Sequence, residues 1–252
     1  MSIGDAEVRA IFDRTVAQLR LFRGNFQQAA EPVHSFASMP APWCYVGAAE
    51  LMFRLAYLLS RVWSPYGLRQ GLRFVALAQQ ADPANADALV VRAKLLAAGG
   101  DPRWMELAAQ TFEQLRASAP EHPRLPNVAA FLCWQAGDFA QAMEYTEREI
   151  ARPSSHEDQL AARADQASLL WMLKRHEESI AAYKALLQED DSDPWQWHNL
   201  SILLAYLKRY DEALAANQRA LALMNFAVAA DFGADLRARM ARMATTKEKE
   251  TR

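Results

Sequence analysis

The sequence predicts an all-α fold, an α-solenoid of stacked helix–turn–helix repeats, on three observations. Ala occurs 49 times and Leu 30 times among the 252 residues, and both lose little free energy on entering a helix. Gly, Val and Ile occur only 9, 10 and 5 times, so residues that favour strands or interrupt helices are scarce. The third observation is a short pattern that recurs every 34 to 37 residues, a length that accommodates two helices and their turns.

The recurring pattern consists of an aromatic residue or His, a small residue three positions later, and then a large apolar residue. The small residues Ala142, Ser179 and Ala213 are 37 and 34 residues apart, and Ala108 lies 34 residues before Ala142. Neither helix of such a pair can bury its apolar stripe alone, so stability must come from stacking successive pairs. We expect the small residues where two helices cross closely, because a larger side chain would overpack the crossing.

The solenoid is expected over residues 1–227, with about five to six helical pairs. The pattern is clearest over 84–227, fair over 8–40 and degenerate over 43–83. In the degenerate stretch a long first helix over 43–62 and Gly71 replace the usual pattern.

Helix starts within the repeats carry capping signals. Asn25 and Asp138 each follow a Gly and can cap the next helix, with Gln28 and Gln141 as their capping-box partners. Asp193 is followed by Pro194, which is a cap residue followed by Pro at the first helical position.

Residues 228–252 are expected to form a C-terminal capping helix and a charged tail. Phe232, Leu236, Met240 and Met243 are spaced 4, 4 and 3 residues apart, as in an amphipathic helix. Such a helix would cover the last repeat, whose outer face has no further neighbour.

The repeat resembles the tetratricopeptide repeat (TPR) family. The residues that carry the resemblance are Trp197, Leu200, Ser201, Leu204, Tyr210, Ala213, Ala220 and Leu221 in the last full repeat, with Gly137, Phe139 and Ala142 in an earlier one. Expansions at 99–104 and 152–157 depart from the pattern, and loops tolerate such insertions. The resemblance implies a right-handed α-solenoid and a binding scaffold in which the first helix of each repeat lines a concave face.

No pattern for catalysis, a metal or a cofactor is found. The net charge of −2 lacks the basic excess of a general nucleic-acid binder. Cys44 and Cys133 cannot form a disulfide framework, and the five His include no pair at i, i+4. The acidic run at 189–193 is interpreted as a solvated loop that supplies a helix cap. We therefore expect no enzyme, no cofactor and no nucleic-acid partner.

A cytoplasmic location without membrane insertion is expected. The N-terminus has no apolar h-region, and the most apolar stretch, at 43–59, is interrupted by Glu50 and Arg54.

The candidate binding surface is a groove lined by the first helices of three consecutive repeats. Its predicted residues are Arg124, Asn127, Phe131, Trp134, Trp171, Met172, Trp195, His198, Ile202 and Tyr206. Aromatic residues, Met and Arg are typical interface anchors. For Trp134 and Trp171 a second interpretation has equal weight, in which they fill gaps between repeats, because periodicity places a Cα atom but not a rotamer.

These residues predict a protein–protein adaptor that binds an apolar-anchored peptide or helix and acts in the assembly or regulation of a larger complex. Some members of the family clamp a chain-terminal carboxylate with inward Lys, Asn and Arg, but inward positions here carry Ala161, Ala164, Ser168 and Ile202 instead. The alternative is a self-assembling structural subunit, and an enzyme or enzyme regulator with a small-molecule site is a weaker third hypothesis.

Overall fold

The computed structural model describes residues 31, 33–35, 37, 38, 43–58, 65–224 and 227–250. Over these residues the regular structure is helical throughout, which confirms the predicted all-α fold. The chain divides into two compact units, Met1–Glu149 and Ile150–Arg252, and each is described by itself.

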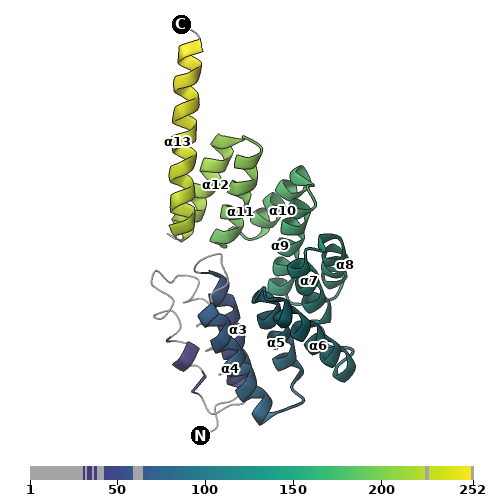
Figure 1. Ribbon diagram of the computed structural model, residues 1–252. Helices are drawn as coiled ribbons and strands as arrows, with labels where there is room; N and C mark the ends of the chain where they lie inside the picture. Colours follow the sequence, from purple (N-terminus) through teal and green to yellow (C-terminus); the bar gives the residue numbers. More distant parts are fainter. Residues whose placement is uncertain are drawn as a thin grey trace. The chain divides into compact units, whose positions relative to one another are not determined.

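The first unit is built from successive antiparallel helices (Figure 1). They are α3 (Trp43–Leu58), α4 (Pro65–Ala81), α5 (Ala86–Ala98), α6 (Pro102–Ser118), α7 (Leu125–Ala136) and α8 (Phe139–Ile150). Helix α3 packs against α4, α4 against α5, and α7 against both α5 and α6. This succession of neighbour contacts is what stacked helical pairs require.

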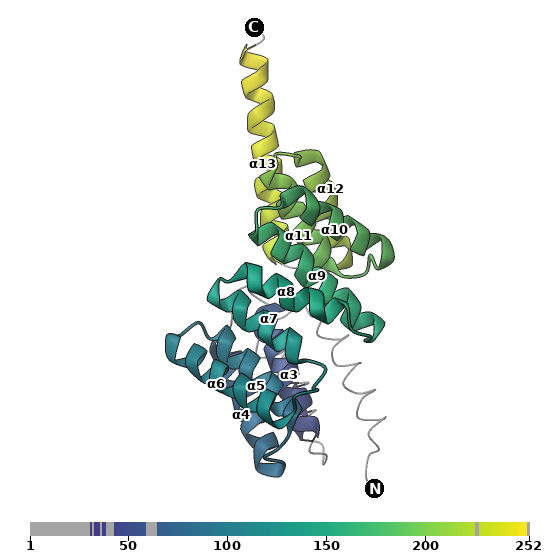
Figure 2. The same ribbon diagram turned by 90° about the vertical axis from the view of Figure 1, so that its right-hand side faces the viewer.

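The second unit is likewise built from successive packed helices and ends in a longer helix (Figure 2). Its helices are α9 (His156–Met172), α10 (His176–Glu189), α11 (Pro194–Tyr206), α12 (Tyr210–Leu223) and α13 (Ala227–Glu250). Helix α9 packs on α10, α10 on α11, α11 on α12, and α12 on α13.

The small residues of the repeat lie at close helix contacts, as the spacing predicts. Ala108, Ala142, Ser179 and Ala213 are all fully buried. The hydroxyl group of Ser179 donates a hydrogen bond of 2.6 Å to the carbonyl oxygen of Ala167, so this polar residue is satisfied inside the contact between α9 and α10.

The degenerate repeat forms a helical pair, α3 and α4. A Cβ atom on Gly71 would lie only 2.7 Å from a methyl carbon of Leu95, so glycine permits the close approach of α4 to α5. The first helix of this pair, expected over 43–62, is described as far as Leu58. The stretch at 59–64 and most of the expected first repeat at 8–40, including Asn25, lie outside the described residues.

Two predicted caps are confirmed. The carboxylate of Asp138 accepts a hydrogen bond from the backbone N–H of Gln141 at 3.0 Å, and that of Asp193 accepts from Trp195 N–H at 2.8 Å. The capping box is incomplete, because the side chain of Gln141 donates instead to Glu144.

The turns before α8, α10 and α12 share one backbone conformation. Gly137 has φ 81°, and Lys174 and Lys208 each have φ 62°. Only Gly adopts this left-handed region without strain, so two lysines occupy positions that favour glycine.

Helix α13 covers the last repeat with its first half only. Leu236 is buried and Phe232 packs against the same core, while the side-chain amide of Asn217 on α12 donates to the carbonyl oxygen of Ala229 at 2.9 Å. Farther along the predicted stripe, Met243 is 54% exposed. In both ribbon views the end of α13 extends past α12 (Figures 1 and 2).

Candidate partner-binding surfaces

The ten predicted groove residues belong to two different units. Four of them lie on or beside α7 in the first unit, and the other six lie on α9 and α11 in the second.

In the first unit, Arg124 and Asn127 take part in polar contacts between helices. The guanidinium group of Arg124 lies 3.3 Å from the carboxylate of Glu50, which is only 8% exposed. Asn127 accepts a hydrogen bond from the Lys94 ammonium group at 2.9 Å and donates one to Glu149 at 3.2 Å. These contacts join α3, α5, α7 and α8, so they contribute to the packing of the first unit.

The aromatic residues of α7 are half-buried by neighbours. Phe131 packs edge-on against Phe53, with ring centroids 5.5 Å apart. The Lys94 nitrogen lies 5.0 Å from the ring centroid of Phe53 and 5.5 Å from that of Phe131. Trp134 meets Phe139 at the start of α8, with ring centroids 5.9 Å apart. Much of the surface of both predicted residues is therefore used inside the first unit.

Sequence reasoning missed the partners in this network, Glu50, Lys94 and Glu149. For Glu50 a signal was present, since it is a lone carboxylate within an apolar helical stretch, and a buried carboxylate needs a counter-charge. No periodicity identified Lys94 or Glu149.

In the second unit, Trp171, His176 and Tyr206 form an aromatic cluster. Trp171 at the end of α9 lies 4.4 Å from His176 and 4.8 Å from Tyr206, measured between ring centroids. His176 and Tyr206 are 5.1 Å apart. Tyr206 is nevertheless 62% exposed, and the neighbouring Met172 is 38% exposed. The cluster thus presents an apolar surface that its own contacts hold in place.

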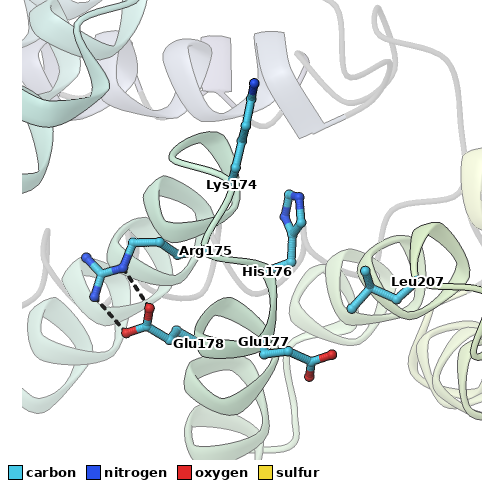
Figure 3. Close-up of a pocket in the computed structure, with 6 residues that line it drawn as sticks. All are labelled: Lys174, Arg175, His176, Glu177, Glu178 and Leu207. Carbon is cyan, nitrogen blue, oxygen red and sulfur yellow. Dashed lines mark hydrogen bonds and ion pairs between the residues drawn. The ribbon is translucent and has the colours of Figure 1, made fainter.

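An open depression of about 370 Å³ shares His176 with this cluster (Figure 3). Its lining residues are Lys174, Arg175, His176, Glu177, Glu178 and Leu207. Lys174 and His176 project to one side of the turn, whereas Arg175 and Glu178 pair on another side (Figure 3).

The carboxylates around the depression are paired with arginines. Arg175 donates two hydrogen bonds to Glu178, at 2.8 and 2.6 Å, and this bidentate contact lowers the pKa of Glu178. Arg209 lies 3.4 Å from Glu177 and also makes a bidentate contact with Glu212. The hydrogen bonds from Arg209, and then that from Lys184, lower the pKa of Glu212 to about 2.

The remaining predicted residues on α11 are less accessible. His198 is fully buried, with its ring 5.6 Å from Phe232 of α13 and 6.0 Å from Trp195. Trp195 and Ile202 are half-buried. His198 therefore contributes to the surface on which α13 packs, an arrangement that the repeat pattern did not predict.

The described residues offer few groups suited to metal binding or nucleophilic catalysis. No group of three or more His, Cys, Asp or Glu side chains in the described part of the chain could hold a metal ion. Burial, and then the charge of Asp138, raises the pKa of the Cys133 thiol, which disfavours the thiolate needed for nucleophilic attack.

Within the described ranges, no helix is both long enough and apolar enough to span a membrane.

Comparison with known proteins shows the fold. The chain is similar to a tetratricopeptide repeat protein from Parabacteroides merdae, with a TM-score of 0.64, 14% identity, and coverage of 93% of this chain and 86% of that one. It is also similar to yeast Tom70, with a TM-score of 0.59, 15% identity, and coverage of 93% and 47%. Human IFIT1, in a dimer with PPP-AAAA, gives a TM-score of 0.64, 14% identity, and coverage of 96% and 55%.

These similarities confirm the tetratricopeptide-repeat fold that the sequence pattern predicted. No protein-family model matches the chain, and the search of curated proteins finds no match.

Proposed function

We propose that this protein is a non-catalytic adaptor that binds an apolar-anchored peptide or helix of a partner protein, for the assembly or regulation of a larger complex. The observation that carries the proposal is the surface formed by Trp171, Met172 and Tyr206. Tyr206 is 62% exposed although its ring packs against Trp171, so a large aromatic side chain is held rigidly at the surface.

A rigid, exposed aromatic group suits partner binding for a physical reason. Covering such a side chain with an apolar group is worth roughly 1.5–3 kcal/mol, and little rotamer entropy is lost because packing has already ordered the ring. The adjacent Met172 adds an adaptable apolar group. The half-buried Ile202 on the same helix as Tyr206 extends the proposed surface.

Site-specific photo-crosslinking tests this proposal. With p-benzoylphenylalanine in place of Tyr206, irradiation of a native lysate should give a discrete adduct that is lost when Trp171→Ala is added. Tyr66, which is 41% exposed on α4, provides the matched control position. If position 66 gives the same adducts, or if Trp171→Ala leaves the adduct at position 206 unchanged while circular dichroism shows a folded chain, the proposal fails.

A self-assembling subunit is the second candidate, and one observation favours it. The apolar stripe of α13 continues beyond its packed part to Met243, which is 54% exposed and could pack against a second copy. Size-exclusion chromatography with light scattering at several concentrations separates the candidates. A Met243→Glu variant that turns a dimer into a monomer would favour self-assembly, whereas a monomer at every concentration would exclude it.

A further inference from the structure

We propose that the partner segment carries Asp or Glu residues beside its apolar anchor, and that Lys174 and Lys208 bind these carboxylates. This inference rests on the proposed adaptor function and defines the chemistry of its partner. It assigns a role to two lysines that the repeat pattern did not identify as part of a binding surface.

The two lysines occupy equivalent places in neighbouring repeats. Lys174 and Lys208 are 34 residues apart, and each ends the turn that follows a first helix, α9 or α11. Each also comes two positions after an exposed apolar residue, Met172 or Tyr206. The second unit therefore presents the same combination twice, an apolar side chain followed by an ammonium group.

The backbone at these turns favours a different residue. Both lysines have φ 62°, and the corresponding turn of the preceding repeat carries Gly137 with φ 81°. A residue with a Cβ atom is strained in this region, whereas Gly is not. Strained positions that persist at an exposed surface point to a role for the side chain, and here the side chain is a cation.

Charge complementarity identifies the partner chemistry. Both lysines are exposed, and among the described residues neither has a carboxylate within ion-pair distance. The nearby carboxylates of Glu177, Glu178 and Glu212 are each paired with an arginine. As far as the described part of the chain shows, the two lysines are thus open to the carboxylates of a partner on this surface.

A peptide fits this surface better than a nucleic acid. Aromatic rings and lysines could in principle hold bases and phosphates. However, Glu177, Glu178, Asp211 and Glu212 in the first turns of α10 and α12 offset the charge of the nearby lysines and arginines, so the surface has no continuous positive stripe for a phosphate backbone. A peptide can place one or two carboxylates opposite the lysines and apolar groups elsewhere.

Peptide selection tests the inference and does not require the natural partner. A random peptide phage library is selected on the full chain, on Lys174→Glu/Lys208→Glu, and on Arg69→Glu/Arg73→Glu. The last pair makes the same charge change at two exposed positions of α4 and serves as the control. We expect the wild-type and control proteins to select apolar peptides flanked by Asp or Glu, and the Lys174→Glu/Lys208→Glu protein to select Lys- or Arg-flanked ones.

Fluorescence anisotropy with the strongest selected peptide gives the quantitative result. Its affinity should fall roughly tenfold in Lys174→Glu/Lys208→Glu, as the loss of two exposed ion pairs implies, and remain unchanged in the control. Raising salt from about 50 to about 300 mM should weaken binding to the wild type more than to the lysine variant, because salt screens exposed charges.

The outcomes separate the inference from the proposed function. If Met172→Ser/Tyr206→Ser abolishes peptide binding but the lysine variant binds normally, the adaptor surface stands and the inference is wrong. If neither variant affects the selected peptides, both are wrong. Tighter binding of a fluorescent oligouridine than of any selected peptide, with the same dependence on the lysines, would overturn the inference in favour of a nucleic-acid ligand.

Discussion

At the scale of single residues, the turns before α8, α10 and α12 each need a residue with a left-handed backbone conformation, and two of these turns also present a lysine side chain. Gly137, Lys174 and Lys208 share a left-handed conformation, yet only the first is the residue that this conformation favours. The carboxyl side chains that follow, Glu178 and Glu212, are fixed by arginines three residues before them.

Replacing either turn lysine with glycine should stabilise the fold. Lys174→Gly or Lys208→Gly removes a strained conformation of roughly 1–2 kcal/mol, of which the greater freedom of Gly in the unfolded chain cancels part. We expect a net gain of roughly 0.5–1 kcal/mol per site in the free energy of unfolding, measured by urea denaturation. Gly137→Ala is the converse variant and should destabilise by a similar amount. A loss of stability in both lysine variants would show that the turns are not strained.

The ion pair of Glu212 should make a small pH-dependent contribution to stability. The pKa of this carboxyl group is lowered in the folded chain to about 2, from an ordinary value of 4.5, chiefly by the hydrogen bond from Arg209. A lowered folded-state pKa means that the contribution is fully present above about pH 4.5 and is lost as the pH falls towards 2. Wild type should therefore be more stable than Glu212→Gln at pH 6 but not at pH 2.

The same titration can be followed directly by nuclear magnetic resonance of the Glu212 carboxyl carbon. Arg209→Gln should move its midpoint upwards, towards the ordinary value. A midpoint near 4.5 in the wild-type protein would contradict the pairing.

At the scale of helices, the repeat period predicted which small residues lie at close helix contacts, but it did not predict where the large side chains point. The spacing placed Ala142 and Ala213 at close helix contacts, because a crossing accepts only a small residue whatever its neighbours are. It could not place the ring of Trp171, which packs against His176 and Tyr206 while Tyr206 remains exposed. Nor could it show that α13 buries His198, because that contact joins residues whose register is set by the packing of α13.

A substitution at Gly233 tests how α13 packs against α12. A Cβ atom there would lie 2.3 Å from the side-chain oxygen of Asn217, which is fully buried and holds Ala229 by a hydrogen bond. In an ordinary helix, Gly→Ala stabilises by about 1 kcal/mol. Here we expect Gly233→Ala to destabilise by roughly 1–3 kcal/mol, because Asn217 must move and lose its bond.

A double-mutant cycle distinguishes this clash from a general effect of the substitution. In an Asn217→Ala background the obstruction is gone, so Gly233→Ala should become neutral or stabilising in thermal unfolding. If Gly233→Ala costs the same in both backgrounds, Asn217 is not the cause.

At the scale of the whole molecule, the notable feature is the division into units at Glu149 and Ile150, within a chain whose repeat pattern continues across that point. The expansion at 152–157, which the sequence indicates as a tolerated loop insertion, begins just after this point. The pattern predicted one solenoid over 1–227, because periodicity identifies each helical pair but carries no signal for where the chain divides into compact units.

The division predicts that the two units respond separately to destabilising substitutions. Val128 on α7 and Leu204 on α11 are both buried in the cores of their own units. Leu204→Ala should cost roughly 2–5 kcal/mol and accelerate amide hydrogen exchange in α9–α12 while leaving α3–α7 protected. Val128→Ala should accelerate amide hydrogen exchange in α3–α7 while leaving α9–α12 protected. The double variant should show both effects additively, since coupling in repeat proteins passes between neighbours. Uniform acceleration along all the helices by either substitution would instead mean that the chain unfolds as one cooperative body.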